Sequence, residues 1–98
     1  MNWEDLQLEG IAWEDEGRAL VIRMREAGGE RCRIVTLQWA QALQLKLGLP
    51  ESRGGYPMTW DGEVRSLADG HYSLRLDFAS DGEIRVICSE IEIKVVEN

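Results

Sequence analysis

The stretch Ser73-Leu-Arg-Leu-Asp-Phe-Ala-Ser-Asp-Gly-Glu-Ile-Arg-Val-Ile-Cys88 contains two runs of alternating polar and apolar residues around one Asp-Gly pair. Alternation with a period of two places the apolar side chains on one face of a β-strand. Asp81-Gly82 suits a chain reversal, because Asp tolerates left-handed backbone geometry and Gly prefers it. The stretch therefore predicts a hairpin with strands over 72–78 and 84–88, and the acidic residues at its turn need no binding site to explain them.

A second hairpin is predicted upstream, on either side of Glu26-Ala-Gly-Gly-Glu30. The paired glycines supply the positive φ that a tight turn requires. The alternating apolar set comprises Leu20, Ile22 and Met24 before the turn and Cys32, Ile34 and Thr36 after it. Arg31 and Arg33 are expected on the opposite, polar face.

Three further segments alternate in the same way, over 6–13, 58–67 and 91–95. In the first of them the parity of the apolar positions switches near Gly10, which predicts a bulge or bend. The parity of the last segment is opposite to that of the strand ending at Cys88, so a second bulge is expected near Ser89-Glu90.

The stretch Trp39-Ala-Gln-Ala-Leu-Gln-Leu-Lys-Leu-Gly-Leu49 is ambiguous. Ala, Leu, Gln and Lys favour a helix. However, the leucines from Leu43 onward alternate strictly with Gln44, Lys46 and Gly48, and a helix would spread them around its circumference. A strand over about 43–48, preceded by a short turn, is the favoured prediction.

These patterns predict an all-β fold with one domain over 1–98. The expected architecture is a mainly antiparallel β-sandwich or bent meander sheet of about seven to eight strands, with at most one short helix. The two hairpins also resemble each other at an offset of 52 residues, so that Ile22-Arg-Met24 aligns with Leu74-Arg-Leu76. A duplicated β-meander would explain this and would give the fold pseudo-symmetry.

The composition is acidic, with 18 Asp and Glu against 11 Lys and Arg and a formal net charge of −7. Nucleic acids and anionic membrane surfaces are therefore not expected as partners, because both need a basic surface. A basic protein would be attracted, although an acidic balance also serves ordinary solubility.

A cytoplasmic location is expected. The start Met1-Asn-Trp-Glu-Asp-Leu6 has no basic stretch followed by an apolar run, and no segment is apolar for long enough to span a membrane. Cys32 and Cys88 lack metal-ligand spacing and are expected to be reduced core residues.

No enzymatic activity, cofactor or metal is expected from the residues. His71 is the only histidine, and no Ser or Cys accompanies it at a catalytic spacing. The Asp-Gly turns lack calcium-loop spacing, and the glycine pairs lack the lysine and helix start of a phosphate loop. The alternative, a small-molecule or enzymatic pocket around His71 and Tyr72, stays open and would need a deep concavity.

The chain has four tryptophans, Trp3, Trp13, Trp39 and Trp60, and most are expected in the core. Trp3 and Trp60 stand out as candidate surface rings, Trp3 because it lies near a terminus and Trp60 because it flanks the acidic Asp61-Gly-Glu63 turn and the loop from Gly54 to Pro57. Aromatic rings beside carboxylates suit the recognition of a basic protein. The candidate protein-binding residues are therefore Tyr56, Trp60, Asp61 and Glu63.

Three patterns of apolar residues in this chain are similar to those of a known protein family. They are Leu6-x-Leu8-x-x-Ile11-x-Trp13, Val35-x-Leu37-x-Trp39 continuing to Leu43-x-Leu45, and Ile84-x-Val86-x-Cys88-x-x-Ile91-x-Ile93. In these the chain resembles small all-β bacterial immunity proteins of polymorphic toxin systems. The resemblance implies binding and blocking of a cognate toxin, and it transfers no site residue.

The expected function is non-enzymatic protein binding, with an immunity-like role as its most concrete form. Homodimerisation or a structural homo-oligomer through an exposed edge strand is the remaining alternative, with residues 91–96 as the candidate edge.

Overall fold

The alternating segments form β-strands in two antiparallel sheets in the computed structural model, which describes residues 2–48 and 56–97. The strands are β1 (Leu6–Glu14), β2 (Ala19–Glu26), β3 (Arg31–Gln38), β4 (Ala42–Leu47), β5 (Asp61–Ser66), β6 (Tyr72–Asp77), β7 (Gly82–Cys88) and β8 (Glu90–Glu97). Two short 3-10 turns, η1 (Asp15–Gly17) and η2 (Ala79–Asp81), complete the regular structure of the described residues. The predicted all-β fold is confirmed, in its sandwich form rather than as a single bent sheet, and the ambiguous segment contains strand β4.

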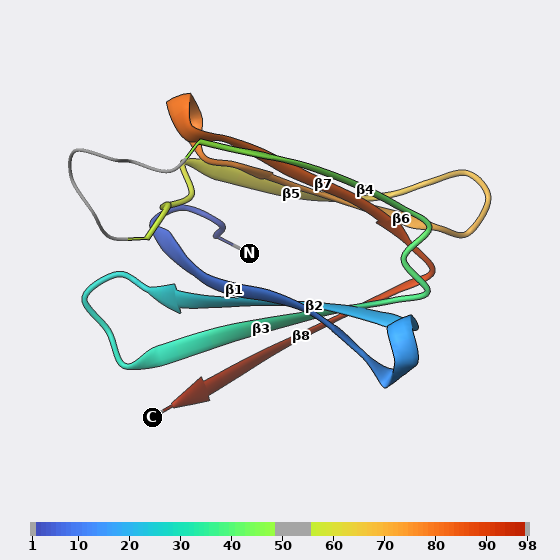
Figure 1. The fold of residues 1–98 in the computed structure, drawn as a ribbon, viewed down its shortest axis with the longest axis horizontal. Helices are drawn as coiled ribbons and strands as arrows, with labels where there is room; N and C mark the ends of the chain where they lie inside the picture. The colour runs from blue at the N-terminus through green and yellow to red at the C-terminus, as the bar shows by residue number, and fades with distance from the viewer. Residues whose placement is uncertain (1, 49–55, 98) are drawn as a thin grey trace.

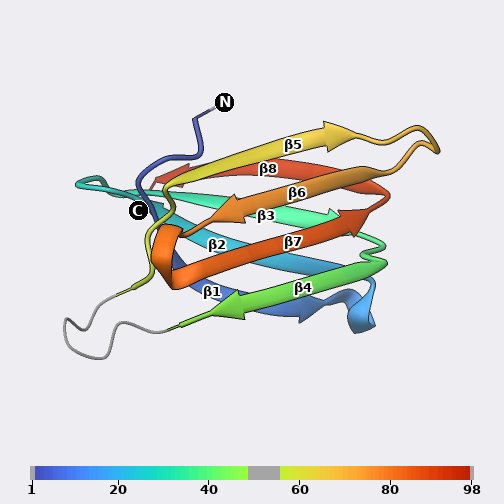
Figure 2. The same ribbon diagram turned by 90° about the horizontal axis from the view of Figure 1, so that it is seen from above.

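Sheet A has the order β1-β2-β3-β8 and sheet B the order β4-β7-β6-β5. The two sheets stack as layers (Figure 1). Seen from above, β4 and β1 lie along one side of the sandwich and β5 and β8 along the other (Figure 2).

The connectivity of the first half repeats in the second. Strands β1, β2 and β3 form a meander in sheet A, and β4 then crosses to sheet B; β5, β6 and β7 form a meander in sheet B, and β8 crosses back. The crossovers are tied together, since the Gln41 N–H donates to Ile87 O at 2.7 Å and the Ser89 N–H donates to Gln38 O at 3.0 Å. Each half thus completes the sheet of the other, the arrangement expected of a duplicated meander.

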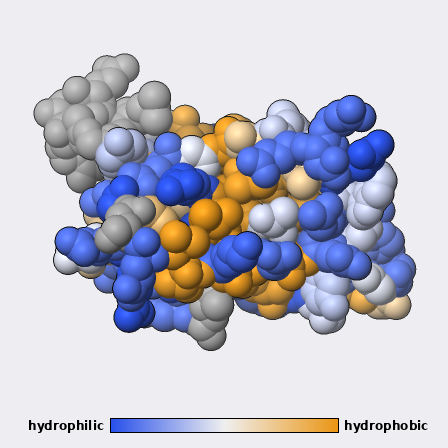
Figure 3. Space-filling view, turned by 90° about the horizontal axis from the view of Figure 1, so that it is seen from below, coloured by the Kyte–Doolittle hydropathy of each residue, from blue (hydrophilic) through white to orange (hydrophobic). Residues whose placement is uncertain are grey.

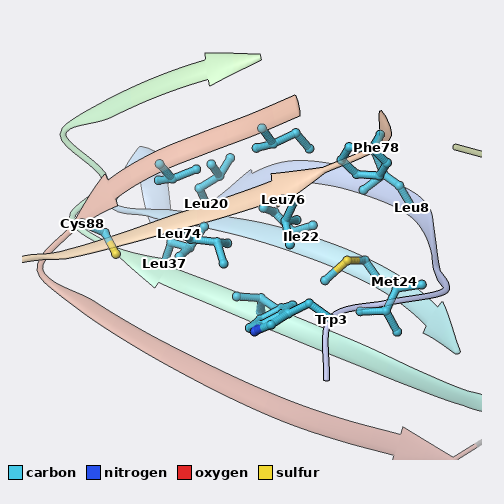
Figure 4. Packing of buried hydrophobic residues seen from close by; sticks show 14 residues of the cluster. Trp3, Leu8, Leu20, Ile22, Met24, Leu37, Leu74, Leu76, Phe78 and Cys88 are labelled. Carbon is cyan, nitrogen blue, oxygen red and sulfur yellow. The ribbon is translucent and has the colours of Figure 1, made fainter. Parts of the chain in front are cut away.

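The core fills the space between the sheets with inward-pointing side chains of both (Figure 4). Trp3 belongs to it, with 6% of its surface exposed, and packs where Gly62 leaves room, since a Cβ on Gly62 would lie 2.7 Å from Trp3 Cβ. The other cluster members are Leu6, Leu8, Leu20, Ile22, Met24, Val35, Leu37, Leu74, Leu76, Phe78, Ile84, Val86 and Cys88.

Both predicted hairpins and the bulge near Gly10 are confirmed, the bulge as a register shift between Leu8 and Gly10 in the β1–β2 pair. The bulge predicted near Ser89-Glu90 is wrong. The parity changes there because the chain leaves sheet B after Cys88 and joins sheet A at Glu90, and the interior then lies on the other side of the strand.

Two face and boundary predictions are corrected. Arg33 pairs with Met24 and Val35 with Ile22, so the inward face of β3 carries Arg33 and Val35, and Cys32 points outward. The strand predicted over 58–67 begins at Asp61, so that Asp61-Gly-Glu63 is part of β5 and not the turn that was predicted, whereas Met58 forms an isolated bridge with Gln7 of β1. Both thiols are reduced and buried as expected, although Cys32 is covered on the outer face of sheet A.

The tryptophan prediction is also corrected. Trp3, singled out as a candidate surface ring, is buried in the core, whereas three other rings are exposed: Trp13 and Trp39 by 56% and 57%, against the expectation of burial, and Trp60 by 72%. All three lie at or beyond the ends of strands, where the opposite sheet provides too little cover.

Candidate functional site

Trp60, Asp61 and Glu63 come together at the start of β5, an edge strand of sheet B. The Trp60 N–H donates to Asp77 O at 2.7 Å, which holds the backbone of Trp60 against β6 while its indole is exposed. Asp61 is exposed, and Glu63 is half-buried. The alternation of β5 places the two carboxylates on the outer face of the sheet, opposite to Gly62, which faces Trp3.

Arg75 of β6 stands among the carboxylates of this surface. Its guanidinium nitrogens lie 3.7 Å from Asp61 Oδ2, 3.8 Å from Glu63 Oε2 and 3.5 Å from Asp77 Oδ2. Glu63 also contacts Arg65. These pairs are partly solvent-exposed and those of Arg75 are long, so each contributes little to stability.

Three acidic residues face one another across neighbouring strands. Asp61 pairs with Asp77, and Asp77 pairs with Glu83 of β7. We call Asp61, Asp77 and Glu83 the acidic row. Directly opposed like charges destabilise a sheet. The row thus places three carboxylates in line from the Trp60 end of β5, with Arg75 near Asp61 and Asp77 and with Lys46 opposite Glu83 at the far end.

Tyr56 is tied to a different surface. It precedes Pro57, whose carbonyl accepts a hydrogen bond from the Leu8 N–H of sheet A at 2.9 Å. The pKa of Arg25 is raised chiefly by its side-chain hydrogen bond to Glu9, with Arg25 Nε 3.0 Å from Glu9 Oε2, and Tyr56 lies close enough to add to this rise. Three of the four predicted residues are therefore adjacent, while Tyr56 adjoins the β1 side of sheet A.

His71 precedes β6, and each of its ring nitrogens has a polar neighbour. Its Nε2 lies 2.7 Å from Gln41 Nε2, and its Nδ1 lies 3.0 Å from Asp69 Oδ1. Because the Gln41 amide nitrogen can only donate, Nε2 is the acceptor and Nδ1 carries the proton in the neutral ring. The His71 side-chain hydrogen bond lowers the pKa of Asp69. The nitrogen that a general base would use is thus occupied by Gln41.

A hollow of about 550 Å³ lies on the outer face of sheet B rather than around His71. Its polar lining includes Arg65, Arg75 and Arg85, and each guanidinium has a carboxylate partner, with Arg85 Nε 3.0 Å from Glu83 Oε1. The three arginines in the hollow are therefore paired with carboxylates. None of them has an uncompensated charge that would select a charged ligand.

The sequence did not identify Trp13 and Trp39 as surface residues. The available clues were their positions: Trp13 comes directly before Glu14-Asp15-Glu16, and Trp39 ends the apolar alternation of β3. A hydrophobic band also crosses the outer surface of sheet A (Figure 3), where Val21, Ile34 and Val96 are partly exposed. Several apolar surfaces thus lie outside the predicted site.

Within residues 2–48 and 56–97, no cluster of three or more His, Cys, Asp or Glu side chains could hold a metal ion. Nor does that part of the chain contain a helix of the length and apolarity that crossing a bilayer requires. Comparison with protein-family models, with curated proteins and with solved structures finds no match to this chain.

Proposed function

We propose that this chain is a non-enzymatic protein-binding module that recognises a basic protein, and that its most concrete role is the immunity-like blocking of a toxin in the cytoplasm. The observation that carries the proposal is the 72% exposure of Trp60 directly beside Asp61 and Glu63. A large exposed ring next to acidic groups is an unfavourable surface in isolation and a favourable one against a complementary partner.

The acidic row adds a second reason. Asp61 and Asp77 are paired directly across β5 and β6, and Arg75, which they share with Glu63, offsets only part of their mutual repulsion. A Lys or Arg from a partner would relieve that repulsion, and the net charge of −7 would speed its approach. Trp60 would supply the apolar anchor, with Asp61 and Glu63 around it.

The test begins with capture from the lysate of the native host, using the whole chain as bait, followed by affinity measurements on the captured protein. Trp60→Ala and Asp61→Lys should each weaken binding at least about 10-fold, the change typical of a residue at the centre of an interface. Binding should also weaken with added salt, because the attraction is between opposite charges.

Matched controls make this outcome specific. Trp39→Ala removes a ring of similar exposure, and Glu92→Lys reverses an exposed charge on sheet A. Both should leave affinity within about 2-fold, well under the tenfold step that corresponds to 1.4 kcal/mol. Equal losses in variants and controls would place the partner elsewhere and overturn the site, and so would wild-type affinity in Trp60→Ala and Asp61→Lys. Thermal melting of each variant checks that it is folded.

A further inference from the structure

The sandwich has four sheet edges, and they differ in how well they are protected against pairing with another strand. Edge strands are normally blunted by charges, bulges or covering segments. β8 carries four charged residues in eight positions, and β5 carries three in six. β1 has its bulge and is partly covered, since Thr59 N–H donates to Leu6 O at 2.9 Å.

β4 has the least protection of the four. Its sequence Ala-Leu-Gln-Leu-Lys-Leu holds a single charge, on Lys46. It is paired with β7 on one side, and among the described residues no strand pairs with its other side. It is also the only one of the four whose net charge is positive, on a chain whose net charge is −7.

The backbone groups available on this edge follow from the pairing with β7. The Gly48 N–H donates to Asp81 O at 2.6 Å, and hydrogen-bonded positions alternate along an antiparallel strand. Ala42, Gln44 and Lys46 therefore face β7 with their backbone groups. The N–H and C=O groups of Leu43 and Leu45 point outward, toward an incoming strand.

The side chains of the same residues are apolar and incompletely covered. Leu43 pairs with Val86 and Leu45 with Ile84, both fully buried, so the two leucines point toward the interior of the sandwich. They are nevertheless 36% and 52% exposed, because sheet B ends at β4. The exposed Trp13 lies on β1, the edge strand on the same side of the sandwich (Figure 2).

We propose that β4 is a dimerisation edge, and that its occupant is β4 of a second copy, antiparallel about a two-fold axis. Two of the antiparallel registers that use its outward groups pair leucine with leucine and keep the two Lys46 side chains apart. With Gln44 opposite Gln44, Leu43 lies opposite Leu45; with Leu45 opposite Leu45, Leu43 lies opposite Leu47. In neither register does Lys46 oppose Lys46.

Charge favours a second copy at this edge over the others. Two chains of −7 repel each other, and self-pairing of β5 or β8 would bring further carboxylates together. Pairing through β4 instead joins the two chains at an apolar edge that carries one positive charge and no carboxylate. Added salt should therefore strengthen the dimer by screening the repulsion. Added salt should strengthen this dimer but weaken the binding of a basic partner at Trp60. The dimer proposal and the proposed function can therefore fail independently.

The first test is the mass of the intact chain in solution by sedimentation equilibrium. Wild type should approach twice the 11.1 kDa of one chain as concentration and salt increase. Leu45→Lys places a charge on the edge and should weaken the dimer at least about 10-fold. Val95→Lys is the matched control, because Val95 is 50% exposed on β8 and should leave the dimer intact.

Amide hydrogen exchange tests the geometry without a variant. The amides of Leu43 and Leu45 should become protected as concentration rises, while those of Gln44 and Lys46 are protected at all concentrations by β7. A wild-type chain that stays monomeric at the highest concentration would overturn the proposal. The proposal would also be overturned if Val95→Lys dissociated the dimer and Leu45→Lys did not. Rapid exchange of the Leu43 and Leu45 amides in the dimer would overturn it as well.

Discussion

At the scale of single residues, Gly82 has the least room for any other side chain. It follows Asp81 in the turn that the sequence predicted, with φ 125° and ψ −154°, a region that only glycine adopts readily. A Cβ at this position would lie 1.8 Å from Lys46 O. Gly82 thus serves both the turn and the close approach of β4.

We expect Gly82→Ala to lower the free energy of unfolding by about 3 kcal/mol or more, since it adds a backbone clash to the conformational strain. Gly70→Ala is the control: Gly70 also has a positive φ of 85°, and a Cβ at that position would meet no atom within 4 Å. Strain alone should cost about 1–2 kcal/mol there. Urea denaturation measures both, and equal losses would show that the contact with Lys46 does not matter.

The Asp69–His71 contact makes stability depend on pH. The folded-state pKa of Asp69 lies below its ordinary value of 3.8, chiefly because of the hydrogen bond to the His71 side chain. A lowered carboxyl pKa means that the stabilisation is present above pH 3.8 and is lost as the pH falls through the lowered folded-state pKa.

Asp69→Asn should therefore be less stable than wild type at neutral pH, and the difference should shrink in acid. Thermal melting at neutral pH and well below pH 3.8 checks this. A difference that stays constant over that range would mean that the Asp69 charge is not involved.

At the scale of elements, β3 shows how an arginine can occupy an inward position. The Arg33 side chain is 10% exposed, and its Nη2 lies 3.0 Å from Glu26 Oε1 of β2. Nη1 donates to Asn2 O at 2.5 Å, and the guanidinium carbon lies 5.7 Å from the centre of the Trp3 ring. The N-terminal segment thus covers this end of the strand.

Arg33→Ala should lower the free energy of unfolding by about 2–3 kcal/mol. The substitution breaks a largely buried ion pair and leaves the half-buried Glu26 carboxylate without this partner. Arg31 on the same strand is the control. Its Nε lies 3.2 Å from Glu97 Oε1, but both side chains are exposed. Arg31→Ala should therefore lower the free energy of unfolding by less than about 1 kcal/mol. Chemical denaturation measures both, and similar losses would contradict the buried role of Arg33.

At the scale of the whole molecule, the two halves exchange their fourth strands. β4 and β8 are equivalent in the connectivity, yet β4 is apolar while β8 is charged. A duplicated meander would begin with equivalent edges, so the difference lies in how each edge is protected. Trp60 and Asp61 lie at β5, the opposite edge of sheet B from β4, so both proposed surfaces can be occupied at once.

The sequence alone determined the all-β class, both hairpins, the bulge near Gly10 and the approximate positions of the strands, and it left open whether they form a sandwich or one bent sheet. These depend on local alternation and on turn residues such as Asp81-Gly82, whose preferences act within a few positions of the chain. It also placed Trp60 next to Asp61 and close to Glu63, because residues a few positions apart in the chain stay close in any fold.

Only the tertiary structure decided which face of each strand is buried and which residues meet across strands. Arg33 points inward because the register with β2 and the cover from Trp3 set its face, and the parity change after Cys88 is a crossing between sheets. The exposure of Trp13, Trp39 and Trp60, the acidic row and the open edge of β4 depend on where each sheet ends. Apolar and polar residues alternate with the same period on a covered strand and on an edge strand. The pattern by itself therefore does not show which elements pack against a strand or pair with it.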